Sequence, residues 1–233
     1  MDTSSIFAVQ KVQKRTTEAQ AADRLRDAIM SGDIPLGARL TEIQMSEQVG
    51  VSRGTIRTAF HQLVQEGLLV QVPYTGWTVM TLSAQDAWEL YTLRASLEAL
   101  ASRLVAQQIK DATTASGTSS AITTAFSRLK AACSKGNKRG IAQEDMNLHK
   151  AIVLSSNHRR LIEQYSLIEH QVRLYIRSSD ALVLNPDEIV EQHDPIVRAL
   201  LEGQVDAAVD FAAKHNELEG AILVEHLRQT EQN

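Results

Sequence analysis

The feature that most limits the fold of this chain is a long stretch without proline. The four prolines stand at positions 35, 73, 186 and 195, and residues 74–185 contain none. Proline inside a helix removes a backbone donor and clashes with the preceding turn, at a cost of about 3 kcal/mol. A stretch of this length without proline is therefore expected to be helical almost throughout. Because aromatic residues make up only 4% of the chain, we predict a helical core built from Leu, Ile, Val and Ala.

Charge and glycine are distributed unevenly along the chain, which predicts two domains. The first 80 residues carry eight basic and eight acidic side chains, whereas the rest of the chain carries 16 and 20. Glycine-containing turns around Gly32, Gly37 and Gly76 lie in the first part and have no counterpart later. We predict an N-terminal extension at 1–16, a first domain at 17–80 and a second domain at 81–233.

The composition excludes several classes of protein. With Cys133 as its only cysteine, the chain cannot form an intrachain disulfide or a CxxC metal site. No apolar run approaches the ~20 residues needed to cross a bilayer, and the first residues lack the basic-then-apolar pattern of a signal peptide. The net charge of −4 excludes a globally basic nucleic-acid coat protein, although a local basic face can still bind DNA. We expect a cytoplasmic protein that does not contact membranes.

The first predicted domain has the order helix, helix, turn, helix and hairpin. Two Thr-x-x-Gln capping boxes, at 17–20 and 41–44, mark the starts of the first two helices. Ser52 is the expected N-cap of the third helix. Residues 68–72 and 77–81 are short apolar runs on either side of a turn, and this pattern predicts a β-hairpin.

The start of the third predicted helix carries the residue types expected of a DNA-reading element. Arg53 and Arg57 are four residues apart and share one face, and Ser52, Gly54 and Thr55 offer hydroxyl and backbone donors to phosphates. In a helix-turn-helix, the first turn of the second helix enters the major groove. The alternative is that the two arginines form only a solvated helix face.

Several motifs in this region fit a known pattern. They are Pro35-Leu36-Gly37-Ala38-Arg39, Glu47-Gln48-Val49-Gly50-Val51-Ser52-Arg53, Leu63-Val64-Gln65-Glu66-Gly67-Leu68-Leu69 and Gly76-Trp77-Thr78-Val79. Through them, residues 17–80 resemble the winged helix of GntR-type bacterial transcription regulators, with the hairpin as the wing. The resemblance implies DNA contacts at Arg39, Ser52, Arg53, Thr55, Arg57 and Gly76. Thr55 and Thr58 stand where the family often has Pro and Glu, which leaves the operator sequence open.

The second domain is predicted to consist of six helices separated by short polar breaks. The helices are expected at 84–109, 118–134, 138–155, 158–179, 186–202 and 204–229, with the first break at 115–117. The fold class is therefore mainly α: an N-terminal winged helix-turn-helix with a small β-hairpin wing, followed by an all-α six-helix bundle.

Asp145, His149, His193 and His215 form a candidate metal site. Asp145 and His149 lie four residues apart on one face of a predicted helix, and the other two fall among apolar residues on two further helices. Imidazole and carboxylate ligands favour Zn, Ni, Mn or Fe over Ca or Mg. The alternative is that each is an ordinary polar residue at the edge of the core, although a buried Asp needs a partner.

Arg94 stands in the middle of an apolar helix stripe, among Leu90, Tyr91 and Leu97. A buried guanidinium needs an anion. One interpretation is an ion pair with Glu98 on the same helix face. The other is that Arg94 binds the carboxylate of a small ligand.

The order Asp-x-x-x-His, His, His on three helices and the motif His193-Asp194-Pro195-Ile196 fit a second known pattern. Residues 84–225 resemble the FCD effector domain that follows the winged helix in the FadR-type branch of GntR regulators, and six helices fit its VanR-like subgroup. The resemblance implies one divalent metal per chain at Asp145, His149, His193 and His215, with zinc or nickel ahead of manganese or iron. It also supports a small organic acid as the effector bound by Arg94.

Together these features predict a ligand-responsive transcription regulator rather than an enzyme. We expect a homodimer that binds a palindromic double-stranded DNA operator as a repressor and responds to a small carboxylate at the metal of its C-terminal domain. One alternative is a metalloenzyme of the helical-bundle type, which the absence of HExxH, ExxH and GxSxG motifs disfavours. The other is a regulator whose metal is purely structural.

Overall fold

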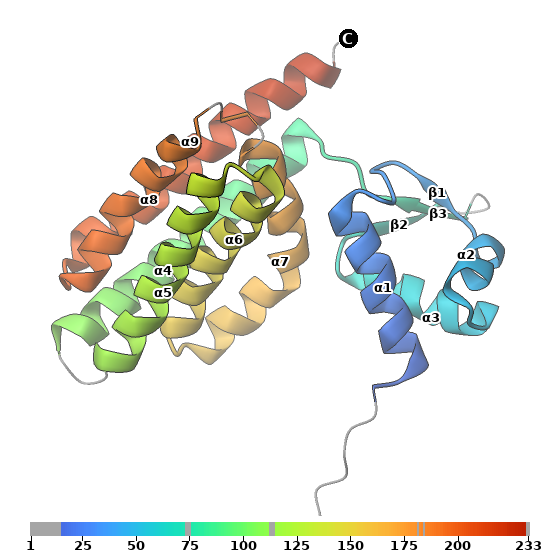
Figure 1. Cartoon of the computed structure of the whole chain (residues 1–233), viewed down its shortest axis with the longest axis horizontal. Helices are drawn as coiled ribbons and strands as arrows, with labels where there is room; N and C mark the ends of the chain where they lie inside the picture. The colour runs from blue at the N-terminus through green and yellow to red at the C-terminus, as the bar shows by residue number, and fades with distance from the viewer. Residues whose placement is uncertain (1–14, 73–75, 112–114, 181, 184, 232–233) are drawn as a thin grey trace, which may run out of the picture. The chain divides into compact units, whose positions relative to one another are not determined.

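The computed structural model describes residues 15–72, 76–111, 115–180, 182–183 and 185–231 (Figure 1). Within these ranges the chain forms nine helices and three short strands, which confirms the prediction of a mainly α fold. The chain divides into two compact units, Met1–Val79 and Met80–Asn233. In the described residues, no helix is both long enough and apolar enough to span a membrane.

The first unit is a three-helix fold with a small antiparallel sheet. Its helices are α1 (Thr17–Ser31), α2 (Glu42–Val49) and α3 (Arg53–Gln65), and its strands are β1 (Arg39–Leu40), β2 (Leu69–Val72) and β3 (Gly76–Val79). The strands pair in the order β1-β3-β2. One set of apolar side chains from helices and sheet forms the core, namely Leu25, Ile29, Ile56, Phe60, Leu63, Leu69 and Trp77.

Two details of this unit differ from the sequence prediction. The N-cap of α1 is Thr16, whose hydroxyl accepts a hydrogen bond from the Ala19 backbone at 3.2 Å, so the box expected at 17–20 is wrong by one residue. The sheet also contains β1, which pairs with β3 so that Leu40 lies opposite Trp77. The expected caps Thr41 and Ser52 are confirmed, and the hairpin turn at 73–75 lies outside the described residues.

The second unit is a bundle of six helices, as predicted. They are α4 (Ala84–Lys110), α5 (Ala115–Lys135), α6 (Lys138–Ser155), α7 (Arg159–Asp180), α8 (Pro186–Leu201) and α9 (Val205–Glu231). The expected break at 115–117 is wrong, because α5 is already helical from Ala115. The two longest helices, α4 and α9, have 27 residues each and pack closely against one another.

Gly220 allows α9 to approach α4 closely. A Cβ atom at this position would lie 2.6 Å from Cβ and 2.9 Å from Cγ of Tyr91, which is closer than non-bonded carbons can pack. The inner faces of the same two helices carry four of the polar side chains described below, Arg94, Glu98, His215 and Asn216. The contact at Gly220 therefore helps to set the spacing of the helices that carry these side chains.

Gly220→Ala should destabilise the second unit, because its new methyl group would overlap Tyr91. We expect the free energy of unfolding to fall by about 1–3 kcal/mol, the usual cost of overpacking, in denaturant unfolding followed by circular dichroism. Gly140→Ala in α6 is the matched control, since its added Cβ would lie 3.7 Å from the nearest atom. The control should change stability by no more than about 1 kcal/mol, in the stabilising direction. Equal effects would contradict the close contact.

Candidate functional site

The four candidate metal ligands lie together in the second unit. Asp145 and His149 come from α6, His193 from α8 and His215 from α9, and all four are buried. One ring nitrogen from each histidine lies within 4.8 Å of the others. The Nε2 atoms of His149 and His193 are 3.1 Å apart. Oδ1 of Asp145 lies 2.7 Å from Nε2 of His193 and 3.5 Å from Nε2 of His149.

Hydrogen-bond acceptors outside the cluster determine which ring nitrogen of His193 and of His149 points into it. Nδ1 of His193 lies 2.7 Å from the Ile189 carbonyl oxygen, and because a carbonyl only accepts, Nδ1 is the donor. Nδ1 of His149 lies 2.7 Å from Oε2 of Glu98 and donates to that carboxylate. In each neutral ring, Nε2 therefore turns a lone pair towards Asp145 and the other histidine.

Lone pairs and a carboxylate that converge in this way need a shared cation. Burial and the Arg94 charge lower the pKa of His149, but the carboxylates of Glu98 and Asp145 outweigh them and raise it to about 9. Burial holds the pKa of His215 well below its usual value, and a positive charge on a neighbouring ring would lower it further, so this ring is neutral with a free lone pair. The shared cation can be a proton on His149 or a metal ion, and the donor set fits a first-row transition metal.

Glu98 connects the cluster to the other buried polar groups. Its Oε1 accepts hydrogen bonds from Arg94 Nε and the Tyr165 hydroxyl, both at 2.8 Å. Its Oε2 accepts from His149 at 2.7 Å and from Asn216 Nδ2 at 3.0 Å. Burial alone would raise the pKa of Glu98, but the positive charges of Arg94 and His149 outweigh it, so the pKa lies well below its usual value. Glu98 is therefore an ionised carboxylate with four donors.

Arg94 is almost fully buried, with 1% of its surface exposed, and only part of its guanidinium is paired. Its Nε donates to Glu98, so the expected ion pair is present. Nη1 and Nη2 are buried and have no hydrogen-bond partner among the described residues. Unpaired buried donors are costly, and more so when they are charged. The two interpretations of Arg94 are thus compatible, because Glu98 uses one edge of the guanidinium and leaves the other for an anion.

In the first unit, α2 and α3 are joined by a tight turn that ends at Ser52. The Ser52 side chain accepts from the Thr55 backbone at 3.1 Å and caps α3, and the two hydroxyls are 2.9 Å apart. Arg53 is exposed on the first turn of α3. Arg57 is also exposed, but its Nε and Nη2 each lie 2.7 Å from an oxygen of Glu42 on α2. This bidentate pair holds the Arg57 guanidinium at a fixed place on the helix surface.

Arg39 and Gly76, the other two residues expected to contact DNA, lie on adjacent strands. Arg39 is exposed on β1 and pairs with Thr78 of β3. Gly76 begins β3 with a φ of +102°, and a Cβ there would lie 3.6 Å from the Leu40 carbonyl oxygen. A positive φ of this size favours glycine, and the absence of a side chain lets the end of the strand approach another molecule closely.

Sequence reasoning missed three polar partners in these sites. Glu42 is 15 positions from Arg57, and Tyr165 and Asn216 are 67 and 118 positions from Glu98. No helical spacing links such distant residues. One signal was present in the sequence: Asn216 directly follows the candidate ligand His215 on a helix with an apolar face, where a buried amide needs a partner.

Two family profiles match the chain and together span most of it. The profile described as "Bacterial regulatory proteins, gntR family" matches residues 17–79, and the FCD domain profile matches residues 89–218. The second match alone covers more than half of the chain.

Relatives and solved structures agree with these matches. The chain is 30% identical over 209 residues to a probable D-xylose utilization operon transcriptional repressor of Paenarthrobacter nicotinovorans, covering 87% of this chain and 88% of that protein. A putative transcriptional regulator GntR from Rhodococcus sp. RHA1 is similar in structure, with a TM-score of 0.75, 24% identity and coverage of 89% and 97%. E. coli McbR/YncC gives a TM-score of 0.73 at 21% identity, with coverage of 91% and 99%. At these identities the two structures support the fold alone.

Glu98→Gln should strongly destabilise the second unit, because it leaves the Arg94 charge buried without a counter-ion. We expect a loss of about 3–5 kcal/mol in the free energy of unfolding, measured by denaturant unfolding in the presence of a chelator. Glu163→Gln removes an exposed partner of Arg160 and serves as the control, with a change within about 1 kcal/mol. A loss no larger than that of the control would mean that the buried network contributes little.

Proposed function

The chain belongs to the gntR family of bacterial transcriptional regulators with an FCD domain, and from this we propose that it is an effector-responsive repressor. In the proposed function, a small carboxylate bound beside a metal ion in the second unit sets the affinity of a homodimer for a palindromic operator. Repression is suggested by the relative that is named as a probable operon repressor. The metalloenzyme alternative is set aside because the matching families and relatives are transcriptional regulators, not enzymes.

Asp145, His149, His193 and His215 are the proposed metal ligands. Their support is the convergence of two oriented Nε2 lone pairs, a neutral third histidine and a carboxylate within a few ångströms. This donor set suits zinc or nickel first, then manganese or iron. A bound metal would supply a Lewis-acid position for an oxygen of the effector, while Glu98 holds the His149 ring in its metal-binding orientation.

The observation that carries the effector proposal is the edge of the Arg94 guanidinium that finds no hydrogen-bond partner among the described residues. Two parallel N–H groups match the two oxygens of a carboxylate, which makes the pair directional as well as strong. Glu98 contacts both Arg94 and His149, so the anion site and the metal site share one buried support. A small organic acid that bridges Arg94 and the metal fits this arrangement. A purely structural metal would leave the two N–H groups unexplained.

DNA reading is assigned to the first turn of α3 and to the hairpin. Arg53 and the capped N-terminus of α3 at Ser52 would enter the major groove, with Thr55 and Arg57 on the same helix and Arg39 and Gly76 on the neighbouring strands. The bidentate pair with Glu42 fits a positioning or phosphate-contacting role for Arg57. Two copies of this unit in a homodimer would match the two halves of a palindrome.

The effector can change operator binding only if it binds two arrangements of the dimer with different affinities. If it binds one arrangement of the dimer better than another, its presence shifts the population towards that arrangement, and DNA shifts effector affinity by the same factor. Relief of repression by the acid requires that the arrangement preferred by the acid binds the operator more weakly.

Arg53→Ala should weaken specific operator binding while leaving the fold intact, because the Arg53 side chain is exposed. We expect at least a tenfold loss in affinity for the operator upstream of the regulated operon, the equivalent of one lost base or phosphate contact, in gel-shift titrations at fixed salt. Arg24→Ala, an exposed arginine on α1, is the control and should bind as the unchanged protein does. Equal binding by both variants would reject the assignment of α3 as the recognition helix.

Arg94→Gln and His193→Ala should separate the anion site from the metal site. Protein purified without a metal-affinity tag is expected to hold about one transition metal per chain by elemental analysis, and His193→Ala should lower that content. Arg94→Gln should keep the metal but lose the thermal stabilisation given by the active member of a panel of small carboxylic acids, because the guanidinium is absent. If Arg94→Gln responds to acids as the unchanged protein does, the effector assignment is wrong. If unchanged protein is metal-free, the metal assignment is wrong.

A further inference from the structure

Glu219 of α9 is a second buried carboxyl group, on the helix face that carries His215. The two residues are four positions apart, so their side chains share one face, and only 6% of the Glu219 surface is exposed. Burial and the charge of Asp145 raise the pKa of Glu219, while His193 and Arg94 act on it in the opposite direction. Glu219 therefore lies close enough to the candidate metal ligands and to Arg94 for their charges to affect it.

Glu219 has far fewer hydrogen-bond donors than Glu98, although both are buried. Glu98 is 3% exposed and accepts from four donors. Oε2 of Glu219 lies 3.0 Å from Ser179 Oγ, and Oε1 has no hydrogen-bond partner among the described residues. Neither oxygen forms an ion pair within the described part of the chain. One of the two oxygens is thus left for a donor from elsewhere.

Ser179 of α7 supplies at most one hydrogen to this carboxyl group. Its Oγ lies 3.1 Å from the Tyr91 hydroxyl and 3.1 Å from the Ile176 carbonyl oxygen. A serine hydroxyl has a single hydrogen, so Glu219 competes with the Ile176 carbonyl for it. A buried acceptor without a donor costs free energy. Glu219 is therefore not explained by a structural role of the kind that Glu98 has.

Tyr91 connects this carboxyl group to the proposed anion site. Its ring centroid lies 5.3 Å from Arg94 Cζ, and its hydroxyl contacts Ser179. The edge of Arg94 that has no partner among the described residues offers donors, whereas Oε1 of Glu219 offers an acceptor. A ligand that satisfies both must carry a carboxylate and, a short distance away, a group that donates a hydrogen bond.

A hydroxyl group suits Glu219 better than an ammonium group does. An ammonium group would need the ionised carboxylate, and burial beside the charge of Asp145 disfavours that form. A hydroxyl group donates to the ionised carboxylate and can also accept from the protonated acid. It therefore fits Glu219 in either protonation state.

We propose that Glu219, supported by Ser179, selects a hydroxyl group on the effector, so that the effector is a hydroxy acid rather than a plain alkanoic acid. This inference rests on the proposed function and adds to it the chemical class of the ligand and the residue that recognises it. The carboxylate of the ligand would bind Arg94 and the metal, and its hydroxyl would donate to Oε1 of Glu219. A site built to bond a hydroxyl rejects the analogue without it, because its own polar group is then left unpaired.

Matched acids that differ only in their hydroxyl groups test the class of the effector. The pairs are propionate and lactate, butyrate and 3-hydroxybutyrate, and hexanoate and gluconate, with alanine as the amino counterpart of lactate. Isothermal titration of the full-length protein, supplied with one equivalent of zinc per chain, measures the dissociation constants. We expect the hydroxy acid of at least one pair to bind at least about tenfold more tightly than its parent acid, and lactate to bind more tightly than alanine.

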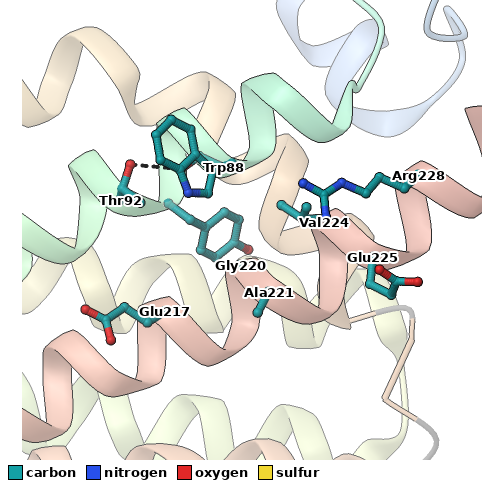
Figure 2. Close-up of a pocket in the computed structure, with 9 residues that line it drawn as sticks. Trp88, Thr92, Glu217, Gly220, Ala221, Val224, Glu225 and Arg228 are labelled. Atoms are coloured by element: carbon teal, nitrogen blue, oxygen red, sulfur yellow. Dashed lines mark hydrogen bonds between the residues drawn. The ribbon is translucent and has the colours of Figure 1, made fainter.

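Three substitutions on α9 test whether Glu219 is the source of this preference. Glu219→Met removes both acceptor oxygens at similar length and should reduce the preference for the hydroxy acid to within about threefold. Glu219→Gln keeps one acceptor oxygen and should retain part of the preference. Glu217→Met is the matched control and should bind as the unchanged protein does, since Glu217 is exposed and lines the outer groove between α4 and α9 (Figure 2). Circular dichroism verifies that each variant is folded.

The outcomes separate this inference from the proposed function. If each parent acid binds as tightly as its hydroxy partner, or if Glu219→Met keeps the preference, the role of Glu219 is wrong and the proposed function stands. Tighter binding of alanine than of lactate would assign an ammonium group to this position and would also overturn the inference. If no acid binds the unchanged protein, the carboxylate part of the proposed function is itself contradicted.

Discussion

The buried carboxylate of Glu98 holds the second unit together. Moving a carboxylate out of water costs several kcal/mol, and this cost is offset only when its oxygens find hydrogen-bond donors and a counter-ion. Glu98 meets the condition with Arg94 from its own helix, His149 from α6, Tyr165 from α7 and Asn216 from α9. One side chain thereby joins four of the six helices. The His149 ring of the histidine cluster is held in one orientation, because both oxygens of Glu98, which accepts its hydrogen bond, are paired.

Much of the fold could be predicted from local signals, and the errors lie where those signals are weak. The six helices of the second unit follow from the proline-free stretch and apolar periodicity, and Thr41 and Ser52 cap their helices as the spacing indicates. Thr16 and Thr17 are adjacent threonines with the same chemistry, so sequence could not choose between them as the cap of α1. Strand β1 is only two residues long and too short for any alternation. Its pairing depends on where β3 lies in space.

The candidate site shows the same division between local pattern and tertiary contact. Asp145 and His149 share a helix face by spacing alone, His193 and His215 fall among apolar residues of two further helices, and the resemblance to FCD domains supports the whole set. Neither spacing nor resemblance identified the partners that Glu98 and Arg57 find on other helices. Those contacts depend on helix crossing angles and rotamers, as with Glu42 and Arg57 on α2 and α3. The edge of Arg94 that lacks a hydrogen-bond partner within the described part of the chain is likewise a property of packing that no spacing in the sequence encodes.

The close contact of Gly220 with Tyr91 limits how α4 and α9 can move relative to each other. Helices packed this tightly cannot come closer, and their separation would expose the buried charges around Glu98. Small sliding of packed helices along their length is the motion that remains inexpensive. Movement of His215 relative to Arg94 would then run parallel to the helix axes, so the distance between the two helices is conserved while their register changes.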